Sequence, residues 1–159
     1  MSFPERVYTS EEVKDAKAIV DQGYKHKLIV EGTPEFRKQV NQVLELIKTA
    51  GYYDFLLSYI RMVMEIDGIT QLRETEVAIW ANKFAVENPV DAASLFIQKA
   101  YAMKEYLDGE LYYGGSSEKR SVAKRIEFLQ TLKDKTSDKD VEAECERLLE
   151  MWKDSSLAF

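Results

Sequence analysis

Apolar residues recur every three or four positions through most of this chain, which is the spacing of one face of an α-helix. Glycine, proline and short polar stretches interrupt the repeat at intervals. The segments between these interruptions are long enough for several helical turns. The pattern therefore predicts about six helices, over residues 9–22, 34–50, 52–66, 89–107, 116–135 and 138–152.

Several of these helices begin at residues that favour helix starts. Thr33 and Asn88 each stand directly before a proline. Their side chains can accept a backbone hydrogen bond, and proline is tolerated in the first turn because its missing N–H has no partner there. Ser137, with Asp140 in the first turn after it, is the expected cap of the last helix. Gly51 follows the second helix and is a natural stop.

Two segments lack a clear helical pattern. Residues 25–32 are too short for a stable helix, contain branched side chains and end at glycine, so they predict a short strand. Residues 69–80 fit either a helix or an extended segment around 77–80, and we favour a short strand there. The predicted fold class is mainly α, an α-rich α+β domain of about six helices with two short strands.

Composition limits the size of the core and the kind of partner. A chain of 159 residues with 45% hydrophobic and 31% charged side chains can bury one sizeable core, so we expect a single helical domain over residues 1–159 with flexible ends at 1–8 and 154–159. The net charge of −6 argues against a nucleic-acid partner. The sequence shows no signal peptide and no apolar stretch of roughly 20 residues. We expect a cytoplasmic protein with no membrane partner.

The residue types exclude several kinds of catalytic site. His26 and Cys145 are the only histidine and cysteine, whereas zinc sites take most of their ligands from these two types and a serine triad needs a histidine. His26 lies between two lysines and is expected to be solvated. Cys145 lies on the apolar side of its helix and is expected to be buried and unreactive. We therefore expect no metal, no cofactor and no catalytic residue of these classes.

Tyrosines gather near the predicted helix ends and a glycine-rich turn. Phenol rings combine a large apolar area with a polar tip, so such residues can line a pocket or an interface. The alternative is that they are half-buried packing residues with the hydroxyl in water. The candidates for an aromatic surface are Tyr52, Tyr53, Tyr106, Tyr112 and Tyr113.

Residues 93–102, with the sequence ASLFIQKAYA, resemble the zinc-binding helix of small gluzincin-like metallopeptidases. In that family the helix carries the pattern His-Glu-x-x-His, in which two histidines four positions apart bind zinc and the glutamate polarises the attacking water. A glutamate of the following helix supplies the third ligand. The resemblance extends to residues 31–36, 52–66 and 106–120, and so covers most of the chain.

The resemblance implies a scaffold that has lost its metal site. Gln98 and Ala102 stand at the two histidine positions, Lys99 stands at the catalytic glutamate position, and Glu118 matches the third ligand. It also implies a pocket lined by these four residues and Tyr101, with a Lys99–Glu118 salt bridge where zinc would lie. The alternative is that this helix packs in the core with its polar residues at the rim.

Three functions remain open. The first is a non-catalytic protein on a degenerate metallopeptidase-like scaffold, which binds a protein or peptide partner. The second is an unrelated helical module for protein interaction or homodimer formation. The third is an enzyme that uses carboxylates or tyrosines in an arrangement that the sequence does not reveal. A strand beside the helix of residues 89–107, with Gln98, Ala102 and Glu118 converging, would favour the first function, and a simple antiparallel bundle would favour the second. A deep cleft with converging carboxylates of strongly perturbed pKa would favour the third.

Overall fold

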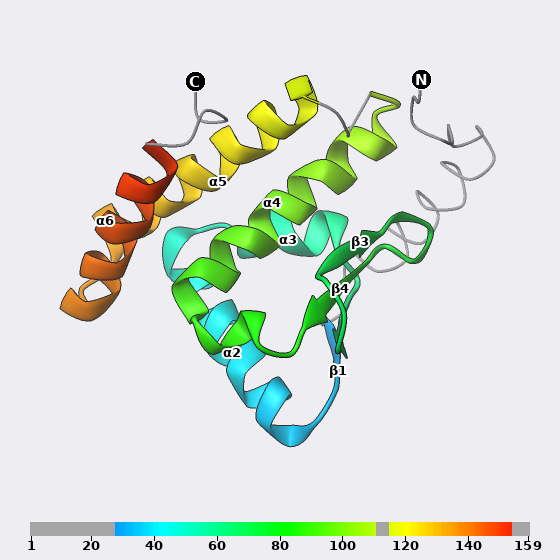
Figure 1. The fold of residues 1–159 in the computed structure, drawn as a ribbon, viewed down its shortest axis with the longest axis horizontal. Helices are drawn as coiled ribbons and strands as arrows, with labels where there is room; N and C mark the ends of the chain where they lie inside the picture. The colour runs from blue at the N-terminus through cyan, green and yellow to red at the C-terminus, as the bar shows by residue number, and fades with distance from the viewer. Residues whose placement is uncertain (1–27, 111–114, 154–159) are drawn as a thin grey trace.

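The computed structural model describes residues 28–110 and 115–153 (Figure 1). The predicted helix over residues 9–22, His26, Tyr112, Tyr113 and the expected flexible ends lie outside the described residues. The described part contains five α-helices, two short 3₁₀ helices and a four-stranded sheet. The prediction of an α-rich α+β fold is confirmed.

The elements follow one another with short connections. The helices of the described part are α2 (Pro34–Ala50), α3 (Tyr53–Tyr59), α4 (Pro89–Leu107), α5 (Gly115–Lys135) and α6 (Lys139–Lys153). The strands are β1 (Ile29–Glu31), β2 (Met62–Ile66), β3 (Gln71–Arg73) and β4 (Ala78–Asn82). The 3₁₀ helices are η1 (Glu74–Glu76) and η2 (Ala85–Glu87). None of the helices in the described ranges is long and apolar enough to cross a membrane.

The strands form one sheet in the order β1-β2-β4-β3. The first three of these are parallel, and β3 pairs antiparallel with β4 at the edge. The described helices lie to one side of the sheet (Figure 1). On that side Val63, Ile79 and Ala81 are fully buried and belong to the hydrophobic core. The sheet therefore contributes one face to the core that the helices complete.

The predicted helix over residues 52–66 is wrong in its second half. Helix α3 ends at Tyr59, Ile60 is extended, and residues 62–66 form β2. The helical spacing of the apolar residues was misleading because β2 lies inside the sheet, where both neighbouring strands supply its backbone hydrogen bonds. A central parallel strand is apolar on both faces, so its sequence resembles that of a buried helix.

The favoured strand within residues 69–80 is confirmed. This segment contains β3 and the start of β4, which are separated by η1 and by Val77 in the left-handed region with φ of 54°. The predicted strand over residues 25–32 contains β1. The sheet has two more strands than the sequence pattern predicted, because β2 and β3 were not recognised.

The helix caps agree with the sequence pattern at two of three sites. Thr33 Oγ1 accepts a hydrogen bond from the Phe36 backbone N–H at 3.1 Å, and Asn88 Oδ1 accepts one from Asp91 at 3.2 Å. The expected cap at Ser137 is wrong by one position, since Asp138 Oδ1 accepts hydrogen bonds from the amides that open α6. A carboxylate also interacts favourably with the helix dipole at this end.

Replacing Thr33 with alanine is expected to lower the free energy of unfolding by about 1 kcal/mol, because the first turn of α2 loses its side-chain acceptor. Chemical denaturation measures this change. Thr33→Ser keeps the hydroxyl and should stay close to wild type. Equal losses in the two variants would mean that the hydroxyl does not stabilise the helix.

Ile60 and Leu129 lie in the hydrophobic core and are 1% and 0% exposed. Cys145 is also fully buried, and burial raises the pKa of its thiol to about 11. A thiol with that pKa is protonated at neutral pH and is a poor nucleophile. The prediction that Cys145 is buried is confirmed, and its low reactivity stays a prediction that the raised pKa supports.

Candidate functional site

The family-matched residues lie on two helices that pack together. Gln98, Lys99, Tyr101 and Ala102 lie on α4, and Glu118 lies in the first turn of α5. The four α4 residues are all partly buried, whereas Glu118 is exposed. The contacts between α4 and α5 therefore decide what this group of residues can do.

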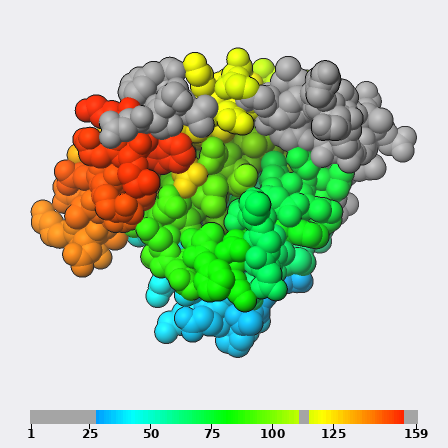
Figure 2. Space-filling view, viewed as in Figure 1, coloured from blue at the N-terminus to red at the C-terminus, as the bar shows by residue number. Residues whose placement is uncertain are grey.

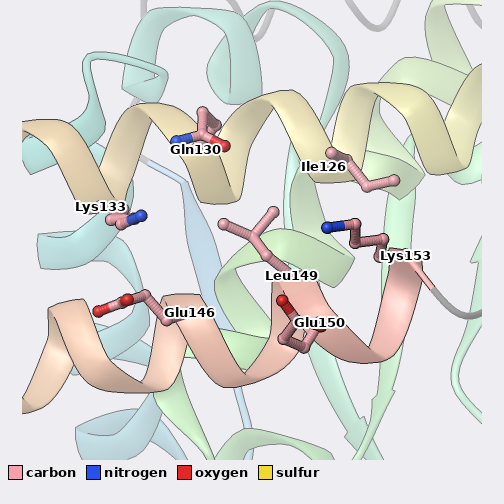
Figure 3. Close-up of a pocket in the computed structure, with 7 residues that line it drawn as sticks. All are labelled: Ile126, Gln130, Lys133, Glu146, Leu149, Glu150 and Lys153. Carbon is pink, nitrogen blue, oxygen red and sulfur yellow. The ribbon is translucent and has the colours of Figure 1, made fainter.

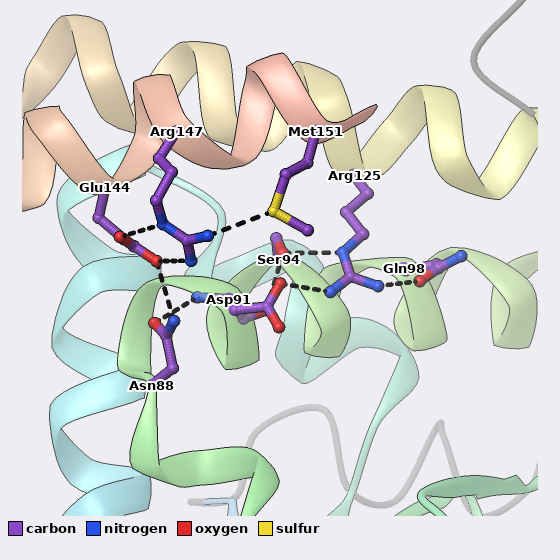
Figure 4. A network of polar contacts seen from close by, with 8 residues as sticks. All are labelled: Asn88, Asp91, Ser94, Gln98, Arg125, Glu144, Arg147 and Met151. Atoms are coloured by element: carbon purple, nitrogen blue, oxygen red, sulfur yellow. Dashed lines mark hydrogen bonds and ion pairs between the residues drawn. The ribbon is translucent and has the colours of Figure 1, made fainter. Parts of the chain in front are cut away.

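Arg125 of α5 holds the centre of this helix pair (Figure 4). Its guanidinium donates three hydrogen bonds to α4: Nε to Ser94 Oγ at 2.8 Å, Nη1 to Gln98 Oε1 at 2.8 Å and Nη2 to Asp91 Oδ1 at 2.7 Å. The Arg125 side chain is only 9% exposed. A buried guanidinium needs such partners, because an unpaired charge in the interior is strongly unfavourable.

Gln98 is hydrogen-bonded at both ends of its amide. Its Oε1 accepts from Arg125, and its Nε2 donates to Ser121 Oγ at 3.2 Å. The Ser121 hydroxyl in turn donates to the Glu118 carbonyl oxygen at 3.0 Å. The residues of α5 that meet Gln98 are therefore Ser121 and Arg125, one and two turns beyond Glu118.

The salt bridge implied between Lys99 and Glu118 does not form within the described ranges, where Glu118 is exposed to solvent. Burial lowers the pKa of Lys99 below its usual 10.5, the positive charge of Arg125 lowers it further, and the carboxylate of Glu74 partly opposes both. Glu74 follows edge strand β3. The carboxylate that acts on Lys99 thus comes from beside the sheet edge and not from α5.

A second polar cluster joins the other end of the same helices. The Glu105 carboxylate, 3% exposed, accepts hydrogen bonds from Arg120 Nε at 2.5 Å and from Ser117 Oγ at 3.2 Å. The pKa of Tyr101 is raised by burial and then by the negative charge of Glu105. Tyr101, the fifth residue of the family-matched pocket, therefore belongs to this cluster and not to the network around Gln98.

Sequence reasoning missed Glu105 and Arg125, which are the centres of the two clusters. The available signal was a polar stripe at helical spacing along α4, formed by Asp91, Ser94, Gln98 and Glu105. Such a stripe on a helix that is otherwise apolar predicts polar partners on the neighbouring helix, since buried polar groups are hydrogen-bonded.

Contacts from α6 complete the network (Figure 4). Asn88 Nδ2 donates to Glu144 Oε2 at 2.9 Å, and Arg147 donates to both oxygens of the same carboxylate. These hydrogen bonds, first from Arg147 and then from Asn88, lower the pKa of Glu144 to about 2. Trp152 lies with its ring 5.0 Å from the Arg125 guanidinium. Helix α6 is therefore attached to the start of α4 through Glu144 near its middle, and to Arg125 of α5 through Trp152 near its carboxyl end.

The three tyrosine candidates within the described ranges, Tyr52, Tyr53 and Tyr106, have different surroundings. Tyr52 donates a short hydrogen bond to Glu127, and its ring packs edge-on against Phe128 at 5.3 Å between centroids. Tyr53 lies under the Lys48 ammonium at 4.8 Å. Tyr106 is only 2% exposed, so its assignment to an aromatic surface is wrong. Tyr106 lies on the buried face of α4, three positions after the buried Met103 and four after Ala102. This spacing was not used to place Tyr106 inside the core.

The hydrogen bond of Tyr52 predicts a measurable titration. Burial and the neighbouring Glu127 carboxylate raise the pKa of Tyr52 from 10.0 to about 12. Because the folded pKa is above the unfolded pKa, the stabilising contribution is complete below pH 10 and is lost as the pH rises through about 12. Phenolate absorbance should show late titration, to which Tyr101 also contributes because its pKa is raised. Tyr52→Phe should remove part of this late titration, and Tyr53→Phe should retain it. An unchanged high-pH titration in Tyr52→Phe would contradict this assignment.

A groove of about 480 Å³ runs between α5 and α6 (Figure 3). Ile126 of α5 and Leu149 of α6 supply its apolar side chains. Lys133 and Glu146 lie toward one end, and Lys153 lies opposite Ile126 toward the other. The remaining lining residues are Gln130 and Glu150. An apolar floor with charged side chains at its margin is typical of surfaces that bind an amphipathic helix.

A second recess, of about 460 Å³, lies where β1 and β2 end. Glu31, Glu65 and Asp67 contribute carboxylates to it, and Lys83 contributes an ammonium group. Lys83 Nζ lies 3.0 Å from Asp67 Oδ1, and Glu65 Oε1 accepts from the Thr33 backbone N–H at 2.8 Å. Carboxyl ends of parallel strands are common ligand positions in open α/β sheets.

Within residues 28–110 and 115–153, no group of three or more histidine, cysteine, aspartate or glutamate side chains is placed to hold a metal ion. The side chain at the first histidine position of the resemblance, Gln98, is engaged by Arg125 and Ser121. Comparison of the chain with protein-family models, with curated proteins and with solved structures found no match.

Proposed function

We propose that this chain is a non-catalytic binding protein on a scaffold similar to that of small gluzincin-like metallopeptidases. The support comes from the helix that resembles their zinc-binding helix. Gln98 uses both ends of its amide in hydrogen bonds to α5, and Lys99 brings a positive charge to the position of the catalytic glutamate. In this proposal a polar network replaces the metal as the connection between the two helices.

The sheet supports this scaffold over an unrelated helical bundle. Helix α4 lies close enough to the end of edge strand β3 for the Glu74 carboxylate to act on the pKa of Lys99. A strand beside this helix is what the metallopeptidase resemblance implies, whereas a simple antiparallel bundle has no sheet. The mixed sheet of three parallel strands and one antiparallel edge strand argues against a simple bundle. The convergence of Gln98, Ala102 and Glu118 that the resemblance implies is not met, because Glu118 is exposed and Gln98 meets Ser121 and Arg125.

The groove between α5 and α6 is the observation that supports partner binding. Ile126 and Leu149 face it, and both are only partly buried. Apolar side chains in a concave surface gain free energy when a partner removes them from water. The occupant that fits is an amphipathic helix of a partner protein, with apolar residues spaced three and four positions apart.

Charges at the margin of the groove restrict the partner further. Glu146 and Glu150 lie along the α6 side, and Lys133 and Lys153 lie toward the ends. A partner helix should therefore present basic side chains toward α6 and acidic side chains near its own ends. Complementary charge of this kind contributes mainly to specificity and association rate.

Site-specific crosslinking tests the proposal in the full-length protein. A photoreactive amino acid at Gln130, which is exposed at the groove, should crosslink to one protein in an extract of the cells that make this chain. The linked peptide, identified by mass spectrometry and synthesised, should bind the purified protein and show helical apolar spacing with a basic flank. Leu149→Glu and Glu150→Lys should each weaken that binding, the first by about tenfold or more.

Two matched controls accompany this experiment. The photoreactive residue at Glu35, exposed at the start of α2, should not give the same adduct, and Met151→Glu places the same charge on α6 outside the groove lining. The proposal fails if the Glu35 and Gln130 adducts are the same, if no adduct forms, or if Glu150→Lys leaves binding of the synthetic peptide unchanged.

A further inference from the structure

The two faces of the sheet differ in what covers them. Successive residues of a strand point to opposite faces, so the paired residues Val63 and Ile79 lie on one face and the paired residues Met64 and Trp80 on the other. The first pair is in the hydrophobic core, and the second pair is not. The apolar side chains of the outer face are Ile29, Met62, Met64, Ile66, Ala78 and Trp80, of which Ala78 is fully buried. Glu31 and Arg73 lie on the same face, and the Arg73 guanidinium is 4.1 Å from the centre of the Trp80 ring.

An apolar outer face is expected for parallel strands, so the question is what covers it. Parallel strands are normally covered on both faces, and here the described core covers only the inner one. Ile29 is 40% exposed, and Met62, Met64, Ile66 and Trp80 are half-buried. Methionine side chains adapt to the shape of a partner, which suits Met62 and Met64 to a binding surface.

Two of the most exposed apolar side chains lie at the carboxyl end of the same sheet. Ile69 follows β2 and is 87% exposed, and Phe84 follows β4 and is 62% exposed. Asn82 fixes both loops, because its Nδ2 donates to the carbonyl oxygens that precede Ile69 and its Oδ1 accepts from the Phe84 backbone N–H at 2.8 Å. Exposed apolar groups held in place in this way lose little entropy when a partner binds.

The recess at the ends of β1 and β2 places charged side chains beside the outer face of the sheet. Met64 and Ile66 of the outer face line it together with Glu31 and Asp67. Three carboxylates and one ammonium line the recess, so its lining is net negative. Arg37 donates to the Gly32 carbonyl oxygen nearby but does not line the recess. The apolar face is therefore continuous with an acidic margin.

We infer that the outer face of the sheet, the recess and the apolar side chains of Ile69 and Phe84 form a second docking surface, which we call the sheet surface. Its partner is a protein segment that presents lysine or arginine beside apolar side chains. Apolar contact with the exposed side chains of Ile69 and Phe84 supplies affinity, because exposed apolar areas mark interaction sites. The carboxylates of the recess select a basic segment over an acidic one.

This surface is separate from the groove between α5 and α6. The sheet and α6 lie at opposite ends of the molecule (Figure 2). No residue lines both the groove and the recess. The inference therefore does not rest on the proposed function, and substitutions in one surface serve as controls for the other.

Selection from a displayed library of random peptides, with the immobilised full-length protein as target, tests the inference. Enriched peptides should combine basic and apolar residues, and a synthetic copy should bind with an affinity that falls as salt is raised. Phe84→Ser and Ile69→Ser should weaken binding, the former by about tenfold or more. Glu31→Lys should weaken it through charge alone.

The chain offers matched controls for both kinds of change. Met151→Ser removes an exposed apolar side chain from α6, and Glu146→Lys reverses a charge at the groove, so both should bind the peptide as wild type does. The inference is overturned if no basic and apolar peptide is enriched, or if Ile69→Ser, Phe84→Ser and Glu31→Lys all bind normally. A photoreactive residue at position 69 that crosslinks within the same chain to residues 1–27 would also overturn it, because the occupant would then be this chain itself.

Discussion

Replacing Arg125 with alanine is expected to lower the free energy of unfolding by about 3 kcal/mol, the low end of the range for breaking a buried ion pair. The substitution removes three hydrogen bonds to α4 and the contact with the Trp152 ring. The low end applies because Asp91, the carboxylate left behind, is 40% exposed and can be hydrated. Equilibrium denaturation by urea measures the loss.

Arg125→Lys is the control for the shape of the charged group. Lysine keeps the positive charge but cannot reach Ser94, Gln98 and Asp91 with one planar group, so an intermediate loss is expected. Asp91→Asn should lower the free energy of unfolding by less than Arg125→Ala does, because the guanidinium would still have neutral acceptors for its hydrogen bonds. A wild-type stability for Arg125→Ala would mean that the network does not hold α4 and α5 together.

Replacing Leu129 with alanine is expected to lower the free energy of unfolding by about 2 to 5 kcal/mol. Leu129 lies on α5 and is fully buried in the core, and Ile60→Ala, between α3 and β2, should fall in the same range. The loss combines the removed apolar area with the cavity that remains. Thermal and chemical denaturation of the purified variants measure it.

Ile69→Ala is the matched control for these core substitutions. Ile69 is 87% exposed, so removing the same kind of side chain there should change the stability by less than about 0.5 kcal/mol. A similarly small change in Leu129→Ala would contradict its place in the core. A large change in Ile69→Ala would mean that this side chain is covered in solution.

Helices of this protein could be predicted wherever the sequence carries a local start signal. Thr33 with Pro34 and Asn88 with Pro89 define the starts of α2 and α4, because capping depends only on residues within the first turn. Local start signals do not predict β2, because no such signal precedes Met62–Ile66. Its conformation depends on pairing with β1 and β4, which are far away in the sequence.

The candidate site was predictable in position but not in contacts. The sequence placed Gln98 and Lys99 on one helix and Glu118 on the next, and the structure has all three on those helices. The partner of Gln98, however, is Arg125, and the carboxylate that acts on Lys99 is Glu74. Helical spacing gives the face on which a residue lies, whereas the angle between two helices decides which residues meet.

The polar network explains how α4 and α5 can keep their positions without a metal between them. A zinc ion would hold two helices together by direct bonds to their side chains. Here Arg125 makes three hydrogen bonds across the same pair of helices, and Glu105 accepts two at the other end.

The most direct test of the proposed loss of the metal site is elemental analysis of the purified full-length protein after incubation with excess zinc and extensive dialysis. We predict a folded protein that retains no zinc, because glutamine, lysine and alanine stand at positions 98, 99 and 102. Retention of about one zinc ion per chain would contradict this account, since a bound ion at that stoichiometry requires a formed site.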